Sequence, residues 1–351
     1  MEKKILIFPY SDMCDIFIEQ IEDLENIDEL YLVCFKGWGY EGKKISFKGK
    51  EISVITDFDF ALQNSDEIWF VDTEYNLDES TLIYPKVNYA HACGKTIRYY
   101  AKETSMLKKE LKGTDSIKEE TDIPKILEVM NTPLVVTAGL YDDNNEMQVE
   151  LSVYEMLHKT NFNVVYIGSQ RYGKALGMYE FPEFMFDNKY ANFEKVLLFN
   201  QYIKEIENEK KPDLIIVGVP GGVSSYSREM VGDFGLLFDL VSISVSTDIF
   251  VLSVPYEDYN IYDIQNLRKY VWERYKIHTD FFNIMPKKVN VNITNSSEQI
   301  RYLTVNNNRV MKKIEDLASK DIFCLKVKSE RNKLTKKVID RLMDYGKIEL
   351  L

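Results

Sequence analysis

The chain has 351 residues, 45% of them hydrophobic and 13% aromatic, which suffices for one very large core or two ordinary ones. A formal net charge of -12 opposes binding to nucleic acid and to anionic lipid, so neither partner is expected. The 4 cysteines are dispersed and only 3 histidines occur, which excludes a secreted disulfide framework and the usual spacing of a zinc site.

The first hundred residues alternate predicted strands and helices. The apolar run at 4–8 is too short for a signal peptide and predicts a first strand. Further strands are expected at 29–35, 52–55, 67–71 and 96–100, with helices at 14–24, 59–63 and 80–92. This βαβ rhythm is typical of a three-layer domain with a mostly parallel sheet, so residues 1–110 predict a Rossmann-like α/β domain.

Residues 111–131 predict a linker and a connecting helix. The stretch 108–120 is rich in lysine and glutamate and has Gly113 in its middle. Asp122 is a candidate helix N-cap, and Pro124 suits the first turn of a helix.

Residues 132–351 predict a second α/β domain with added carboxyl-terminal strands and a final helix. Strands are expected at 133–138, 162–167, 213–217 and 248–253, with helices at 147–158, 193–207, 234–241 and 263–275. An alternating pair of strands, 287–293 and 302–305, and a helix at 332–345 follow. The longest apolar zone, 235–255, contains two aspartates and is too polar to span a bilayer, so we expect a cytoplasmic, soluble protein.

Three predicted strands of the second domain end in polar or glycine-rich corners. Ligands of open α/β sheets bind just beyond the carboxyl ends of strands, so these corners are the candidate binding site. The candidate residues there are Gly139, Tyr141, Asp142, Asp143, Asn144, Asn145, Gly168, Ser169, Arg171, Lys174, Pro220, Gly221 and Gly222. A turn that needs a positive φ explains the last three equally well.

The loop 139–146 stands where a phosphate-binding loop would stand, between a buried strand and a helix. A working loop needs a lysine and a hydroxyl at its end, whereas this one ends in Asn144, Asn145 and Glu146. The stretch 168–174 does match Gly-x-x-x-x-Gly-Lys, but Ala175 follows it. A degenerate phosphate loop and a polar helix-capping loop both remain open, and no catalytic residue or metal ligand is assigned.

A further corner lies in the first domain, at Lys36, Gly37 and Trp38. The indole of Trp38 can stack on a flat ligand or dock a peptide. Packing of the same ring over the edge of the sheet is the alternative.

In several of these motifs, the chain resembles a family of bacterial peptide maturation system proteins. The resembling stretches are 35–39 with Gly42 and Lys43, 132–136 with Gly139, 167–169, 181–185 and 218–222. The resemblance implies a role in maturing ribosomally made, post-translationally modified peptides of the bacteriocin type, without fixing a reaction. The second domain is also similar to the dethiobiotin-synthetase and MinD branch of P-loop proteins, which often dimerise, with Glu146 where that branch has a lysine.

Three hypotheses follow. The first is an accessory protein that binds a precursor peptide, a partner maturase or a nucleotide-like ligand at the strand-end corners. The second is a ligase or kinase that uses ATP or GTP with Mg²⁺, in which Arg171 and Lys174 replace the missing lysine and Asp142 or Asp143 holds the metal. The third is a structural homodimer scaffold without a small ligand.

Overall fold

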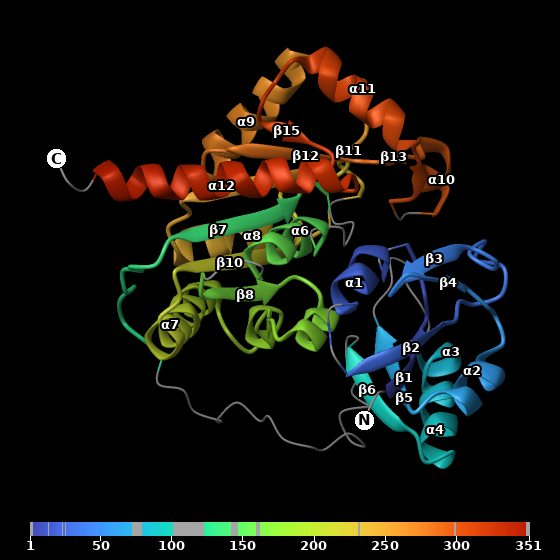
Figure 1. Ribbon diagram of the computed structural model, residues 1–351. Helices are drawn as coiled ribbons and strands as arrows, with labels where there is room; N and C mark the ends of the chain where they lie inside the picture. Colours follow the sequence, from blue (N-terminus) through green and yellow to red (C-terminus); the bar gives the residue numbers. More distant parts are fainter. Residues whose placement is uncertain are drawn as a thin grey trace. The chain divides into compact units, whose positions relative to one another are not determined.

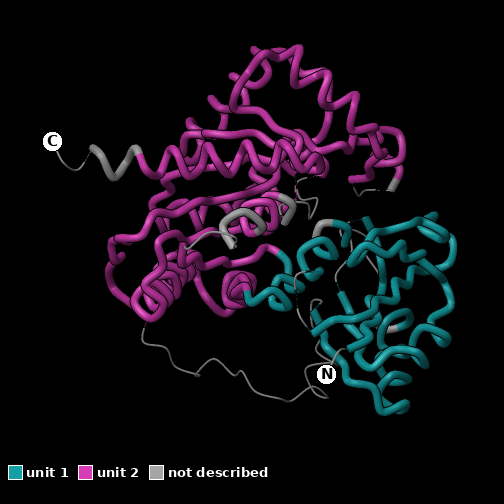
Figure 2. Tube along the Cα trace, in the orientation of Figure 1, with its two compact units in different colours: residues 1–121, 170–177 teal, residues 122–169, 178–351 magenta. Residues whose placement is uncertain are grey.

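A computed structural model of the chain describes residues 3–12, 14–22, 24, 26–71, 79–100, 123–141, 147–158, 162–230, 232–297 and 300–348. The chain forms two compact units, one of residues 1–121 and 170–177 and the other of residues 122–169 and 178–351 (Figure 2). The short segment 170–177 belongs to the first unit although it is distant in sequence. Its Tyr172 is buried, and the ring centroid lies 4.9 Å from that of Phe17.

The first unit is built on a four-stranded parallel sheet of order β2-β1-β5-β6 (Figure 1). Its strands are β1 (Lys3–Phe8), β2 (Ile27–Leu32), β5 (Glu67–Val71) and β6 (Thr96–Tyr100). Its helices are α1 (Cys14–Ile21), α2 (Phe58–Asn64), α3 (Glu79–Leu82) and α4 (Tyr84–Ala92). The apolar side chains of β1 and β5 pack with those of α2 and α4 in one buried core.

The predicted strand at 52–55 does not join this sheet as a full strand. Instead β4 (Lys50–Ser53) pairs antiparallel with β3 (Lys44–Phe47) in a separate hairpin, and only an isolated bridge joins Ile55 to Val33. Most side chains of the hairpin are exposed, so it has too little apolar surface for a place inside a sheet covered on both faces.

The second unit is built on a seven-stranded parallel sheet of order β15-β12-β11-β7-β10-β8-β9 (Figure 1). Its strands are β7 (Leu134–Gly139), β8 (Val164–Gly168), β9 (Tyr179–Glu180), β10 (Leu214–Gly222), β11 (Ile249–Pro255), β12 (Phe281–Met285) and β15 (Ile322–Phe323). Its helices are α6 (Met147–His158), α7 (Asn192–Lys210), α8 (Leu236–Ser244), α9 (Ile261–Tyr275), α10 (Val291–Ser297), α11 (Asn307–Leu317) and α12 (Lys328–Ile348). The predicted α/β class with two mostly parallel, Rossmann-like sheets is confirmed.

Smaller elements complete the second unit. The 3-10 turn η2 (Glu183–Met185) precedes α7, whereas η1 (Arg171–Leu176) falls in the segment that belongs to the first unit. The predicted strand pair near 287–305 is present as β13 (Lys287–Val289) and β14 (Tyr302–Thr304), although residues 291–293 begin α10 instead. No helix in the described ranges is long and apolar enough to cross a bilayer.

The two faces of the seven-stranded sheet differ in polarity. On one face, side chains of Val136, Leu252 and Phe282 pack with apolar residues of α7, α8, α9 and α11. Because strand side chains alternate between faces, their neighbours Thr137, Ser253 and Asn283 point to the other face, which α6 and α12 cover. Buried polar residues of these two helices are Glu150, Ser152, Glu330, Arg331 and Thr335.

The predicted connecting helix is wrong for the residues that the structure describes, because 123–131 are not helical. Side chains of α7 take the hydrogen bonds that a helix would have made. Asn200 accepts from the amide of Glu128 at 2.8 Å, and Glu207 accepts from the amides of Asn131 and Thr132 at 2.7 and 2.6 Å. Tertiary bonds to a long, stable helix therefore outweigh the local helix signal.

Replacing Glu207 with alanine is expected to lower the free energy of unfolding by about 2 kcal/mol, because two backbone amides and the ammonium of Lys204 lose a charged acceptor. Urea denaturation of the full chain measures the change. Glu209→Ala is the control, since the Glu209–Lys210 pair is exposed and should contribute little. Equal losses in the two variants would refute the anchoring role of Glu207.

Candidate functional site at the carboxyl edge of the seven-stranded sheet

The topology places a ligand-binding edge beside β7, near the middle of the sheet. After β7 the chain continues to β8 on one side, whereas after the adjacent strand β11 it continues to β12 on the other side. Ligands of open α/β sheets bind where neighbouring strands part in this way, outside their carboxyl ends. The carboxyl ends of β7, β10 and β11 therefore define the candidate site.

Most of the predicted corner residues of the second domain lie on this edge. Gly139 ends β7 and pairs in register with Gly222 of β10, while Gly168 ends β8, the strand next to β10. Tyr141 and Ser169 directly follow β7 and β8. The four loop residues Asp142, Asp143, Asn144 and Asn145 lie outside the described residues.

The glycine-rich stretch 218–222 extends β10 instead of forming the predicted tight turn. Its pairing with β7 is interrupted between Gly218 and Gly222, and Gly221 has φ +84°, a conformation that favours glycine. Beyond it, the amide of Val223 donates to the carbonyl of Gly139 at 2.9 Å. Pairing with the end of β7 thus prolongs a strand that the glycine pattern alone would have ended.

Four half-buried tyrosines from separate segments gather at this edge. The rings of Tyr141 and Tyr226 meet edge to face, with centroids 5.4 Å apart. The hydroxyl of Tyr270 donates to the carbonyl of Val223 at 3.3 Å. Tyr141, Tyr259 and Tyr270 pack against the same apolar core. Burial, followed by the charges of Tyr141 and Glu257, raises the pKa of Tyr259.

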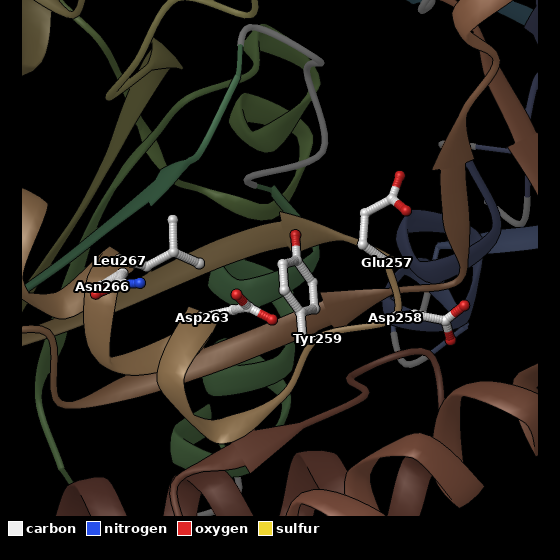
Figure 3. A pocket seen from close by; sticks show the side chains of 6 residues that line it. All are labelled: Glu257, Asp258, Tyr259, Asp263, Asn266 and Leu267. Atoms are coloured by element: carbon white, nitrogen blue, oxygen red, sulfur yellow. The ribbon is translucent and has the colours of Figure 1, made fainter.

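A pocket of about 520 Å³ opens after β11. It is lined by Glu257, Asp258, Tyr259, Asp263, Asn266 and Leu267. Tyr259 stands in the middle of these side chains, with Leu267 and Asn266 on one side and Glu257 and Asp258 on the other (Figure 3).

The carboxylates of this pocket have partners within the second unit. Glu257 forms an ion pair with Lys288 of β13 at 3.0 Å, and Asp258 lies 3.7 Å from Lys313 of α11. Asp263 accepts from the backbone amide of Asn260 at 2.8 Å and so caps α9. The pocket therefore combines acidic groups, two of which are paired with lysines, with a tyrosine and a leucine.

A buried carboxylic acid lies behind the same edge. Glu150, in the first turn of α6, accepts a hydrogen bond from the backbone amide of Ser169 at 3.0 Å. A Cβ atom built on Gly218 would lie 1.9 Å from Oε1 of Glu150, so only glycine leaves room for the carboxyl group against β10. Burial raises the pKa of Glu150 to about 7, and Ser169 partly offsets that increase.

Three polar atoms around this carboxyl group are buried without a hydrogen-bond partner among the described residues. They are Oε1 of Glu150, the hydroxyl of Thr137 and the hydroxyl of Ser169. Thr137 pairs in register with Gly218, so it lies beside the carboxyl group. The sequence signal for this group was Glu150 itself, a charged residue inside the run Val149–Val153, and the prediction missed it.

The remaining predicted residues belong to the first unit. Arg171 and Lys174 lie in η1, within the segment 170–177. Lys36 and Gly37 are exposed after β2, and the ring of Trp38 packs on Phe35 with centroids 5.0 Å apart. The structure thus brings the strand-end corners of the second unit together and places the basic candidates and the tryptophan corner in the other unit.

The first unit has an ionic cluster of its own after β1. Lys43 donates to Asp12 at 2.5 Å, to Asp15 at 3.0 Å and to the hydroxyl of Tyr10 at 2.8 Å. The ammonium group also lies 5.3 Å from the centre of the Tyr10 ring. The cluster ties the start of the β3–β4 hairpin to the segment between β1 and α1.

Replacing Lys43 with methionine is expected to lower the free energy of unfolding by about 1 to 2 kcal/mol, a value reduced because the Lys43 side chain is 31% exposed. Thermal and urea unfolding of the full chain provide the measurement. Lys44→Met is the matched control, since Lys44 pairs with Glu51 in an exposed position. If Lys43→Met lowered the free energy of unfolding no more than Lys44→Met, the cluster would not connect the hairpin to the segment after β1 as described.

No group of three or more histidine, cysteine, aspartate or glutamate side chains is placed to hold a metal ion in the part of the chain that the structure describes. The described residues of this edge offer hydrogen bonding by tyrosines and backbone groups, with one buried acid behind them.

Comparison with known proteins gives a fold but no function. No family model and no curated protein matches the chain. Its structure resembles that of a DUF1611 family protein from Anabaena variabilis ATCC 29413, with a TM-score of 0.56, 9% sequence identity and coverage of 98% of this chain and 100% of that chain.

Two other solved structures are much more distant. Aspartate semialdehyde dehydrogenase II from Vibrio cholerae has a TM-score of 0.27 and 16% identity, with 62% of this chain and 66% of that chain covered. A pseudomurein peptide ligase type C from Methanothermus fervidus has a TM-score of 0.25 and 9% identity, with 81% of this chain and 44% of that chain covered. Neither likeness carries an argument, whereas the DUF1611 protein shares the two-unit α/β architecture over nearly the whole length.

Proposed function

We propose that the chain is a binding protein of peptide maturation whose second unit takes a precursor peptide at the carboxyl edge of β7, β10 and β11. The main observation that supports this proposal is the cluster of Tyr141, Tyr226, Tyr259 and Tyr270 beside the pocket after β11. Tyrosines combine a large apolar ring with a hydroxyl and lose little conformational entropy, which makes them common at peptide and protein interfaces. The sequence resemblance supplies the biological setting of the proposal.

The charges at this edge favour a peptide over a nucleotide. A triphosphate needs positive charge, usually from a lysine at the end of the phosphate loop. Here Glu257 and Asp258 line the pocket, and Lys288 and Lys313 are paired with them. Asp263 brings the lining to three carboxylates against these two lysines, so this tyrosine-lined pocket instead suits a peptide that carries basic or amide side chains.

A selection from a displayed random-peptide library tests this proposal. Selection on the wild-type full chain is expected to enrich peptides that do not bind the Tyr259→Ala variant. Lysine or arginine should be over-represented in these peptides. Lys269→Ala is the control variant, because Lys269 lies exposed on α9 and outside the pocket lining. Enrichment that is equal for Tyr259→Ala and wild type would reject this edge as the peptide site.

Titration calorimetry with ATP and GTP, with and without Mg²⁺, separates the proposal from a nucleotide-dependent enzyme. We expect no binding at millimolar nucleotide. Micromolar binding that Lys174→Ala weakens would favour the enzyme instead, and phosphate release would then become the next measurement.

A further inference from the structure

We propose that Glu150 is a proton-dependent positioning residue for the carboxyl edge of the second unit. When protonated, it holds the corners of β8 and β10 together; when ionised, it loosens them. The inference rests on the proposed function only for its consequence, which is weaker ligand binding above neutral pH.

The geometry makes Glu150 a junction between three elements. It belongs to the first turn of α6, its carboxyl group lies against Gly218 of β10, and Oε2 accepts from the amide of Ser169 directly after β8. The backbones of both strand ends therefore meet at one carboxyl group. A change in its charge acts on both corners at once.

Among the described residues, neither β8 nor β10 offers a charged side chain to this carboxyl group. The β10 residues 214–222 include none that is charged, and β8 contributes the phenol of Tyr166, whose ring meets that of Tyr154 at 5.0 Å. The helix α12, which packs on α6, buries Glu330 and Arg331. Burial raises the pKa of Glu150, and among the described residues the hydrogen bond from Ser169 opposes this increase.

The neutral acid fits this site better than the anion. A buried, ionised carboxylate without a partner is costly, and a local opening that admits water removes the cost. Between the ordinary pKa of 4.5 and the folded pKa of about 7, each pH unit therefore multiplies the population of the opened corner by about ten, and above about pH 7 the population stays constant. The opening would involve the backbone at 139–141, 168–169 and 218–222, which surrounds the junction.

Hydrogen–deuterium exchange on the ligand-free full chain tests the inference. Rates at about pH 6 and about pH 8.5 are corrected for intrinsic exchange, and wild type is compared with Glu150→Gln. In wild type, protection at the three corners is expected to fall about tenfold at the higher pH, whereas the amides at the start of β11 and β12 keep theirs. In Glu150→Gln, which retains the shape without the charge, protection should not change with pH.

A second variant controls for general effects of a buried acid. Glu330→Gln removes another buried carboxyl group from the same sheet face and is expected to keep the pH response of wild type. Equal pH responses in wild type and Glu150→Gln would overturn the proposal. Because no ligand is present, that failure would leave peptide binding untouched, and absence of peptide binding would leave the exchange result standing.

Discussion

Replacing Gly218 with alanine is expected to lower the free energy of unfolding by about 3 kcal/mol. The new Cβ atom would lie 1.9 Å from Oε1 and 2.2 Å from the carboxyl carbon of Glu150. Glu150 is 1% exposed, so its carboxyl group cannot swing into water without displacing α6. Urea denaturation of the full chain measures the loss.

A double-mutant cycle shows whether Glu150 causes this loss. In the background of Glu150→Ala the carboxyl group is absent, so the additional effect of Gly218→Ala should shrink to less than about 1 kcal/mol. A full loss in that background would mean that the glycine is needed for its backbone alone. Such a result would remove Gly218 from the account of the buried acid.

Replacing Glu150 with glutamine changes the free energy of unfolding by an amount that depends on pH. At about pH 8.5 this change is expected to be about 3 kcal/mol more favourable than at about pH 4. The pKa of the carboxyl group is about 7 in the folded chain, against an ordinary value of 4.5. Between these values the unfolded chain releases the proton and the folded chain keeps it. The group therefore supports stability below pH 4.5, and that support is lost as the pH rises to about 7.

Subtracting the two stability curves removes the titrations that wild type and Glu150→Gln share. The difference should grow in favour of the variant from pH 4.5 to about 7 and stay constant above. Parallel curves over this range would show that Glu150 ionises as easily in the folded chain as in the unfolded one. Fluorescence-detected denaturation across the pH range is sufficient for the comparison.

Local sequence patterns were sufficient where an element is a clear apolar run or an amphipathic stretch between turns. The predicted bounds 67–71, 96–100 and 147–158 coincide with β5, β6 and α6. The patterns failed where tertiary contacts decide. The prediction missed β12 and α11, and it ended β10 too early because pairing with β7 cannot be deduced from glycines.

The candidate site shows the same division. The glycine corners of β7, β8 and β10 were predicted, because strand ends with small residues are visible in the sequence. Of the tyrosine cluster only Tyr141 was predicted, since Tyr226, Tyr259 and Tyr270 come from other segments that only the sheet order brings near it. The raised pKa of Glu150 likewise depends on burial, which includes the contact with Gly218, and Ser169 opposes the increase; both residues are distant from Glu150 in sequence.

Fluorescence anisotropy of one selected, labelled peptide tests the central claim most directly. The account predicts micromolar binding to wild type, binding weaker by at least about tenfold for Tyr259→Ala, and no displacement by millimolar ATP with Mg²⁺. Equal affinity for wild type and Tyr259→Ala, or displacement of the peptide by ATP, would contradict a peptide site at the carboxyl edge of the seven-stranded sheet.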